Sequence, residues 1–363
     1  MFRSITTIRL GKPHKRTAFG LSLTGLLLCV VVLILLVSLQ GTVNRSLIKL
    51  HDALRFRADA PVGIVGARKH YFYMRHRDGL PLPRCADLRP RPESRYAVLV
   101  EYIGSNDGYF LSALRLSVRL HLYVQAVRHE TDFVLEFVRE EPPRVTDADV
   151  VSALRAGYDQ VCHARPVHGG LYNRFVMFNM TQYASVLFLD SDILPVNDVS
   201  DFIANGTLAL QVADKHAMWA RDVEDWFNAG VMLVLPDAAI FNELMRRLNQ
   251  LLASGLILWI EEYAGRLDGI NQKDQAILNH VLQKGNSLRM SKKYNALLFK
   301  QTAASEEVLR YAHLIHLINT KPWKEPWCYL RYNHGKICDL WFETPTVLSQ
   351  HFLDTHSAYA TKS

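Results

Sequence analysis

Two carboxylates stand one residue apart at the end of an apolar run. Asp190 and Asp192 follow Val186-Leu-Phe-Leu189, a stretch typical of a buried strand in a parallel sheet. Open α/β sheets bind ligands at the carboxyl ends of their strands, and hard divalent cations bind carboxylate and phosphate oxygens. The pattern therefore predicts a metal–diphosphate site. The alternative is an ordinary turn in which Asp190 or Asp192 caps the next helix.

Further segments with polar or reactive side chains stand in order before and after this pair. They are Ser105-Asn-Asp-Gly-Tyr109, Arg174 followed by Gln182-Tyr183, Phe227-Asn-Ala-Gly-Val231, Asn271-Gln-Lys-Asp274-Gln275 and His316-Leu-Ile-Asn-Thr-Lys321-Pro-Trp323. Each alone has a structural explanation. The first is a helix-capping turn, Asp274 begins a helix, and a histidine among apolar residues usually packs in a core.

The elements that must position these residues alternate between strands and helices. Strands are predicted at 96–100, 133–138, 186–190, 208–212 and 230–235, and helices at 112–122, 147–157, 172–184 and 238–252. This alternation predicts an α/β domain with a mostly parallel, doubly wound sheet.

The segments together resemble glycosyltransferase family 8, the family of glycogenin and plant glucuronosyltransferases, over about residues 96–330. The resemblance implies a GT-A type, Rossmann-like fold. It also implies transfer of a sugar from a UDP-sugar, with retention of configuration, to a glycan, glycoprotein or glycolipid. UDP-glucose, UDP-galactose, UDP-glucuronate, UDP-xylose and UDP-GlcNAc all remain candidate donors.

The resemblance assigns the metal and the nucleotide to matched residues. Asp190, Asp192 and His316 bind the metal, and Lys321 contacts the diphosphate. Two carboxylates and an imidazole suit Mn²⁺ better than Ca²⁺ or Zn²⁺, with Mg²⁺ as an alternative. The other nucleotide-binding residues implied are Tyr109, which stacks on uracil, Asn106, in the turn that holds the nucleoside, and Arg174, which contacts the donor where the family usually has Lys. Asn319 replaces a glycine of the family pattern.

The resemblance also assigns the sugar site. Asn228 faces the donor sugar, and Asp214, favoured over Asp225, is the second sugar-binding residue. Asp274 and Gln275 lie beside the reacting sugar carbon, and whether either acts as a nucleophile or only stabilises a front-face substitution stays open.

Two other functions remain as alternatives. One is a catalytically inactive, membrane-anchored scaffold. The other is a haloacid-dehalogenase-type phosphatase, whose Asp-x-Asp motif usually continues differently and opens its domain.

The N-terminal segment predicts a membrane anchor. Residues 17–44 carry no charge and 21–39 are almost wholly apolar, whereas a bilayer-spanning helix needs about 20 such residues. Basic residues precede this segment without an acid, which favours a cytoplasmic N-terminus. We therefore expect a type II protein of the Golgi or ER, with its catalytic domain in the lumen. The predicted parts are a cytoplasmic tail (1–17), a signal-anchor (18–40), a stem (41–95), the catalytic domain (96–345) and a C-terminal tail (346–363).

The charge distribution indicates which partners to expect, and the cysteines indicate a disulfide. Residues 1–95 hold 17 Lys/Arg and 5 Asp/Glu, whereas residues 96–363 hold 25 and 30, so the domain is acidic and nucleic-acid binding is not expected. The sequence does not indicate an oligomeric state. Four cysteines are predicted to be luminal: Cys85, Cys162, Cys328 and Cys338. Among their possible pairings we favour a Cys328–Cys338 disulfide. Acceptor sequences for N-glycosylation begin at Asn44, Asn179 and Asn205, the last being the most loop-like.

Overall fold

A computed structural model describes residues 81–348 except 105–106, 145, 168–171, 222–226, 255–272, 283–284, 299–304, 319–320 and 324–334. The predicted tail, signal-anchor and most of the predicted stem lie outside these residues. Within the described part of the chain, no helix is both long and apolar enough to span a bilayer.

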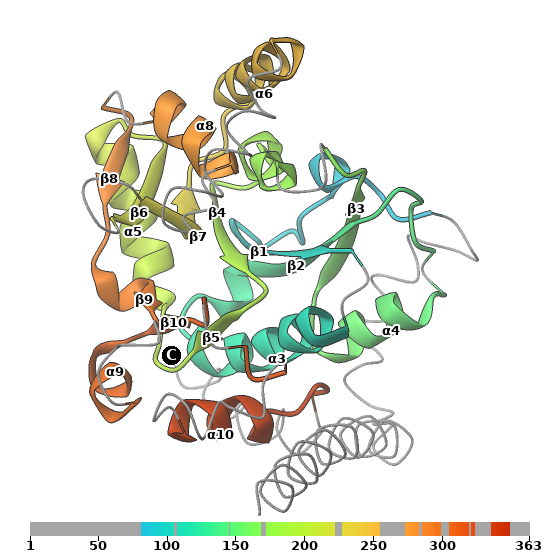
Figure 1. The fold of residues 1–363 in the computed structure, drawn as a ribbon, viewed down its shortest axis with the longest axis vertical. Helices are drawn as coiled ribbons and strands as arrows, with labels where there is room; N and C mark the ends of the chain where they lie inside the picture. The colour runs from blue at the N-terminus through green and yellow to red at the C-terminus, as the bar shows by residue number, and fades with distance from the viewer. Residues whose placement is uncertain are drawn as a thin grey trace, which may run out of the picture. The chain divides into compact units, whose positions relative to one another are not determined.

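The main sheet runs through the centre of the domain (Figure 1). Among the described residues it has seven strands in the order β3-β2-β1-β4-β7-β6-β8. The strands are β1 (Tyr96–Ile103), β2 (Thr131–Val138), β3 (Gln160–Ala164), β4 (Ser185–Asp190), β6 (Ala217–Arg221), β7 (Phe227–Val234) and β8 (Ser287–Arg289). Only β7 opposes both of its neighbours, so the sheet is mostly parallel, as predicted.

A second, smaller sheet lies beside the carboxyl end of β4. Its described strands are β5 (Ile193–Pro195), β10 (Leu314–His316) and β9 (Ala296–Leu297), in the order β5-β10-β9. Since β5 follows β4 after a two-residue turn, this sheet brings the C-terminal part of the chain to the end of β4.

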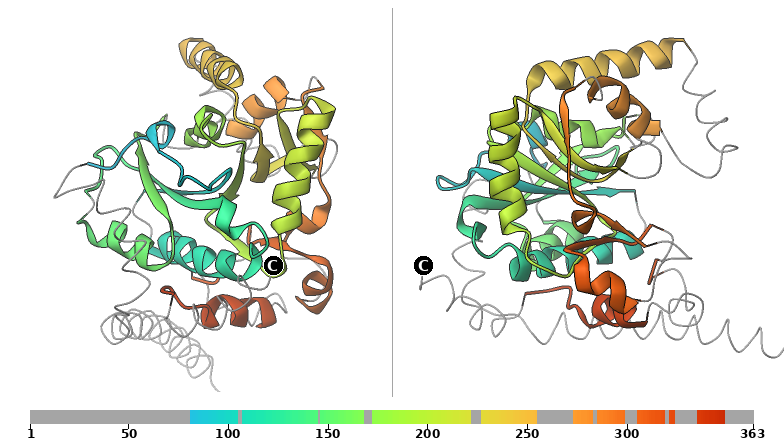
Figure 2. Two further views of the ribbon diagram at one scale, coloured as in Figure 1. Left: turned by 180° about the vertical axis from the view of Figure 1, so that it is seen from behind. Right: turned by 90° about the vertical axis from the view of Figure 1, so that its left-hand side faces the viewer.

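Helices cover both faces of the main sheet (Figures 1 and 2). On one face lie α3 (Asp107–Tyr123), α4 (Ala148–Arg155) and α5 (Ser200–Ala213). On the other lie the 3-10 helix η4 (Asn173–Asn179), α6 (Ala238–Ala253) and α8 (Lys273–Leu282). Further elements are the 3-10 helices η1 (Cys85–Asp87), η2 (Arg128–Glu130) and η6 (Lys292–Tyr294) and the helices α9 (Ser305–Tyr311) and α10 (Gly335–Glu343).

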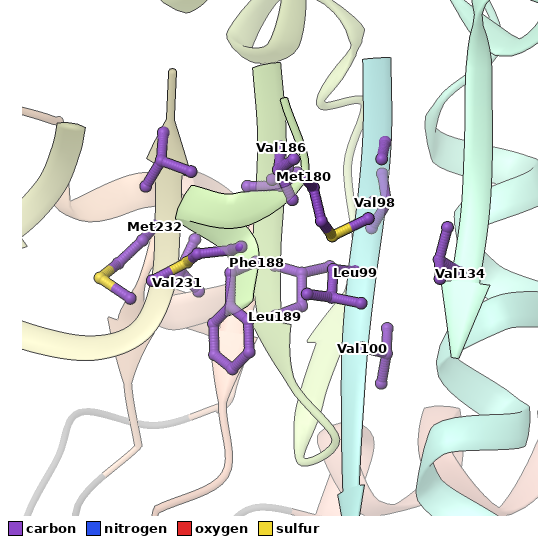
Figure 3. Close-up of a cluster of buried hydrophobic side chains, with 14 of the residues drawn as sticks. Val98, Leu99, Val100, Val134, Met180, Val186, Phe188, Leu189, Val231 and Met232 are labelled. Atoms are coloured by element: carbon purple, nitrogen blue, oxygen red, sulfur yellow. The ribbon is translucent and has the colours of Figure 1, made fainter. Parts of the chain in front are cut away.

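Because both faces are covered, the central strands hold runs of buried apolar side chains (Figure 3). Residues 97–100 of β1 and 186–189 of β4 have no exposed surface. Their side chains pack between the two helix layers and form one core with those of β2 and β7. A rigid core of this kind fixes the positions of the polar residues that follow each strand.

Residues 81–95, which we predicted to be part of the stem, pack against this domain. Leu82 and Leu88 are buried, and Cys85 forms a disulfide with Cys162 of β3, with 5.0 Å between the Cα atoms. Residues 82–94 therefore belong to the globular unit. Cys338 is disulfide-bonded as well, and Cys328, its predicted partner, lies outside the described residues.

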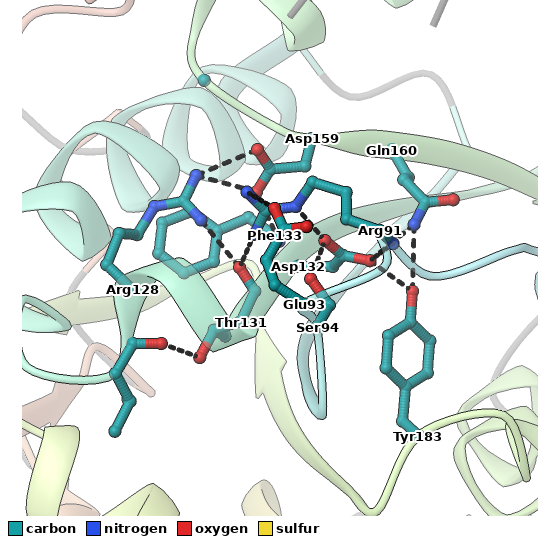
Figure 4. A network of polar contacts seen from close by, with 12 residues as sticks. Arg91, Glu93, Ser94, Arg128, Thr131, Asp132, Phe133, Asp159, Gln160 and Tyr183 are labelled. Atoms are coloured by element: carbon teal, nitrogen blue, oxygen red, sulfur yellow. Dashed lines mark hydrogen bonds and ion pairs between the residues drawn. The ribbon is translucent and has the colours of Figure 1, made fainter. Parts of the chain in front are cut away.

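A buried polar network also holds this segment (Figure 4). The Asp132 carboxylate, at the start of β2, accepts hydrogen bonds from Arg91 Nε at 2.6 Å, Ser94 Oγ at 2.7 Å and Gln160 Nε2 at 2.7 Å. Tyr183 Oη donates to the same carboxylate at 2.9 Å, and burial followed by the Asp132 charge raises the pKa of Tyr183. The network lies at the amino end of the sheet, away from the end of β4.

Two predicted elements were wrong. Residues 208–212 belong to helix α5 and not to a strand, because Phe202, Ile203 and Leu210 face the core at helical spacing. Of the helix predicted at 172–184, only the 3-10 helix η4 forms. Asn205, predicted in a loop, is an exposed residue within α5.

Candidate active site

The two carboxylates lie where β4 ends. Asp190 is the last residue of β4, and Asp192 follows in the turn to β5. The apolar residues before them are fully buried, so the strand fixes where the carboxylates emerge. Since β4 lies beside the parallel strand β1, this is the carboxyl edge of an α/β sheet, where ligands bind.

Strand β10 brings an imidazole to the same turn. It pairs antiparallel with β5, so His316 lies opposite Ile193, and Leu317 N donates to the Asp192 carbonyl at 3.1 Å. His316 Nε2 is 3.2 Å from Asp192 Oδ1 and 3.7 Å from Asp190 Oδ2. One ligand atom from each of the three residues lies within 4.8 Å of the others.

These residues fit a divalent cation. Asp192 Oδ1 is buried and accepts no hydrogen bond, a state that costs free energy unless a cation or a proton satisfies the oxygen. Carboxylate oxygens with one imidazole nitrogen are ligands that Mn²⁺ accepts. Asp190, Asp192 and His316 are thus the residues that would hold the cation.

Lys321 and two aromatic rings border the carboxylates. The Lys321 ammonium contacts Asp192 Oδ2 and lies 5.6 Å from the centroid of the Tyr109 ring. Tyr109 and Trp323 meet edge to face at 5.0 Å, and a Cβ on Gly108 would lie 1.9 Å from the Trp323 ring. Glycine is therefore required at 108. Burial, and then the charge of Asp190, raises the pKa of Tyr109.

Arg174, predicted to contact the donor, lies among acids of the site. Its guanidinium faces three acids: Nε is 2.8 Å from Asp274 Oδ2, and Nη2 is 3.3 Å from Asp190 Oδ1 and 4.0 Å from Glu101 Oε2. Nη1 donates to the Ala229 carbonyl at 3.3 Å. Arg174 therefore positions acids of the site, and its side chain is only 10% exposed.

These ion pairs shift the pKa values of the buried groups. Burial raises the pKa of Asp274, and Arg174 opposes that rise. Burial also raises the pKa of Glu101 well above its usual range, again against Arg174 and together with the neighbouring Glu136. Burial alone would lower the pKa of Arg174, but Asp190, Asp274 and Glu101 raise it, so the guanidinium stays charged.

The start of β7 and helix α8 complete the site. Gln275 Oε1 accepts from Ala229 N at 3.2 Å, which ties α8 to β7 beside Asn228. Asn228 Oδ1 accepts from Gly230 N at 2.9 Å. A Cβ on Gly230 would lie 2.1 Å from His316 Cε1, so the close approach of β7 to the histidine requires glycine there.

Of the other predicted site residues, Asp214 does not belong to the site. It is exposed and ends α5 with a φ of 53°. The strand that follows it begins at Ala217, which pairs with Val234, and Val234 pairs with Val186 at the start of β4. Asp214 is therefore at the opposite edge of the sheet from Asp190. The remaining candidates, Asn106, Asp225 and Asn319, lie outside the described residues.

Two residues that sequence reasoning missed take part in the site. Glu101 lies between Asp190 and Glu136 in the register of the sheet and contacts Arg174. A charged residue inside the apolar run of β1 was the available signal. Asn295, buried beside His316 and Asn228, has no such local signal.

Comparison with known proteins shows which family this part of the domain is similar to. Residues 158–326 match the model of glycosyl transferase family 8. This part of the chain is therefore similar to a family 8 glycosyltransferase domain. The match agrees with the predicted family over these residues, and the mostly parallel sheet agrees with the predicted α/β fold.

Individual relatives are more distant. Inositol phosphorylceramide glucuronosyltransferase 1 of Arabidopsis thaliana is 33% identical over 82 residues, 23% of this chain and 14% of the relative. Glycogenin of Komagataella phaffii is 27% identical over 177 residues, 44% of this chain and 39% of the relative. The chain thus spans less than half the length of these curated relatives. The structure of the glycosyltransferase GlyE of Streptococcus pneumoniae aligns with a TM-score of 0.49 at 16% identity, over 74% of this chain and 66% of GlyE.

Proposed function

We propose that the protein transfers a sugar from a UDP-sugar to a carbohydrate-bearing acceptor, with Mn²⁺ and with retention of configuration. The carrying observation is the grouping of Asp190, Asp192 and His316 within 4.8 Å, with the Lys321 ammonium on Asp192. The family 8 match supports a glycosyltransferase and gives no support to the phosphatase alternative.

Each residue of the site has a separate role in the proposed reaction. When bound, a divalent cation supplies positive charge to the diphosphate as the bond to the sugar breaks. Lys321 adds a second charge at the same place. Tyr109 offers its ring to the nucleobase, while Asn228, Asp274 and Gln275 border the space for the sugar. Arg174 pairs with the Asp274 carboxyl group, which borders the place where the oxocarbenium-like centre forms.

The names of the relatives suggest which donor sugar and which acceptor to test first. Two curated relatives carry glucuronosyltransferase in their names, the second being UDP-glucuronate:xylan alpha-glucuronosyltransferase 1 of Arabidopsis thaliana. UDP-glucuronate is therefore the first donor to test. A glycan or a glycolipid is the class of acceptor we propose.

The test is a donor panel with the purified full-length protein. UDP-sugars are offered with Mn²⁺, and release of UDP is measured with and without candidate acceptors. We expect turnover of one donor and its loss in Asp190→Asn, Asp192→Asn and His316→Ala. Asp201→Asn, which changes an exposed acid of α5, is the matched control and should keep turnover. UDP binding without turnover of any donor would favour the inactive scaffold.

We also propose that the domain works in the lumen of the Golgi or ER, behind the predicted signal-anchor. The Cys85–Cys162 disulfide supports this location, since disulfides persist in oxidising compartments. Protease added to sealed microsomes should then remove only the short tail. Digestion of the whole domain would show the reverse orientation.

A further inference from the structure

Asn295 lies between the metal-site histidine and the amide predicted to face the sugar. It stands between η6 and β9 and is 3% exposed. Its Oδ1 is 3.2 Å from His316 Nδ1, and its Nδ2 donates to Asn228 Oδ1 at 3.1 Å. Three side chains from separate parts of the chain are thus joined in one row.

The direction of these hydrogen bonds follows from a single backbone group. Gly230 N–H can only donate, so the Asn228 atom that it contacts is the carbonyl oxygen. The Asn295 atom facing that oxygen must then be its NH₂ group, and the other end of the Asn295 amide is an acceptor. Therefore His316 carries a proton on Nδ1.

This tautomer has a consequence for the metal site. With the proton on Nδ1, the lone pair of neutral His316 is on Nε2. That nitrogen faces Asp192 Oδ1 at 3.2 Å and Asp190 Oδ2 at 3.7 Å. A lone pair on Nε2, directed at the carboxylate oxygens of Asp190 and Asp192, has the orientation that a bound cation requires.

The space around the ring leaves it little freedom. Gly230 lies so close that any Cβ there would clash with His316, and Asn295 holds the edge of the ring that carries Nδ1. A rotation of the ring would break the bond to Asn295. In turn, the Asn228 oxygen is held by Gly230 N and Asn295 together, which directs its NH₂ group away from them.

We propose that Asn295 is a positioning residue that fixes His316 in the metal-binding tautomer and Asn228 with its NH₂ group toward the donor sugar. The inference rests on the proposed function for the identity of the metal and the donor. Partners of metal-ligating histidines outside the ligand set change metal affinity by about 10–100-fold when they are replaced. Asn295 should behave as such a partner and, through its second bond, also affect recognition of the sugar.

Two substitutions separate its two hydrogen bonds. Asn295→Leu keeps the size of the side chain and removes both bonds. Asn295→Asp keeps an acceptor for His316 Nδ1–H but places an oxygen against Asn228 Oδ1. Asn197→Leu is the control, since it removes a partly buried amide that donates to the Ala312 carbonyl outside the site.

Binding of Mn²⁺ to the metal-free full-length protein, measured by calorimetry, is the first readout. We expect Asn295→Leu to weaken it by about 10–100-fold, while Asn295→Asp and Asn197→Leu bind as the wild type does, within about threefold. With Mn²⁺ present, Asn295→Asp should weaken UDP-sugar binding more than UDP binding. Equal Mn²⁺ affinity in Asn295→Leu and wild type would overturn the proposal.

The tautomer itself is the second readout, and it needs no metal. Nitrogen NMR of the ¹⁵N-histidine-labelled protein at pH 8 should show His316 protonated on Nδ1, with its signals assigned by their loss in His316→Ala. A proton on Nε2 with none on Nδ1 would overturn the proposal even if Asn295→Leu did not fold. If the wild type bound no Mn²⁺ but showed the Nδ1 proton, the metal assignment in the proposed function would fail and the role of Asn295 would stand.

Discussion

Replacing Arg174 should destabilise the protein in a pH-dependent way. Its guanidinium is the cation shared by Asp190, Asp274 and Glu101, at 3.3, 2.8 and 4.0 Å, and it is almost fully buried. Removing one partner of a buried ion pair costs about 3–5 kcal/mol, because the other charge stays buried alone. We expect a penalty of that size for Arg174→Met at pH 8.

The penalty should shrink at low pH, and the sign follows from the pKa values. Burial already raises the pKa of Asp274 and of Glu101, and Arg174 opposes the rise in both. One charge at about 4 Å is worth about 4 kcal/mol at an effective dielectric constant near 20, or about 3 pKa units. Without Arg174 these acids bind protons more tightly when folded than when unfolded. The stability of Arg174→Met relative to the wild type therefore falls as pH rises from about 5 to 8.

Urea unfolding at pH 5 and pH 8 measures this difference. Arg174→Lys is the matched variant, because it keeps the charge but not the planar fork that reaches several acids at once. It should lose less than half of what Arg174→Met loses at pH 8, and it should keep transfer activity. Equal penalties for Arg174→Met at both pH values would mean that lost packing, and not the unpaired acids, explains the effect.

Three further predictions concern single residues of the site and the sheet. Lys321→Ala should lower kcat by about 10²–10³, with a smaller effect on the KM of the donor, because charge on the leaving diphosphate grows in the transition state. Steady-state kinetics at saturating Mn²⁺ measure this. A change in kcat below about threefold would mean that Lys321 is only a surface residue. Gly230→Ala should weaken Mn²⁺ binding by about tenfold or more, since its methyl group would displace the His316 ring, and calorimetry with unchanged affinity would contradict this. Burial raises the pKa of Glu136 to about 8, so its folded form holds a proton that the unfolded chain has lost, and stability falls as pH rises from about 4.5 to 8. Glu136→Gln should therefore stabilise the protein at pH 8 by up to about 5 kcal/mol and leave it unchanged near pH 4, and a gain that is equal at both pH values in urea titrations would refute this reasoning.

The metal ligands were predictable to different degrees. Asp190 and Asp192 follow a fully apolar strand, and that local pattern alone indicated the carboxyl edge of a sheet. His316 has no local signal that separates it from a core histidine. It could be assigned only from a family resemblance, because the pairing of β10 with β5 that brings it to Asp192 joins segments far apart in sequence.

The error at 208–212 has a clear physical origin. An apolar run of five residues fits a buried strand or one side of a helix, and at 208–212 the helix forms because the core-facing residues before it continue at helical spacing. A strand ending at Val212 would have placed Asp214 at a carboxyl edge. As the end of α5, the same residue lies at the amino edge of the sheet, away from the site.

The direction of the hydrogen bonds in the site could not be predicted from residue types at all. An asparagine offers an oxygen on one side of its amide and a nitrogen on the other, and the sequence does not say which side faces which neighbour. In this protein Gly230 N–H sets the orientation of Asn228, then of Asn295, and then the tautomer of His316. Only glycine is small enough at position 230 to lie against the His316 ring. The same position therefore determines the packing of the ring and which ring nitrogen faces a metal. The sugar-facing amide and the metal ligand are therefore expected to change together when either end of this row is altered.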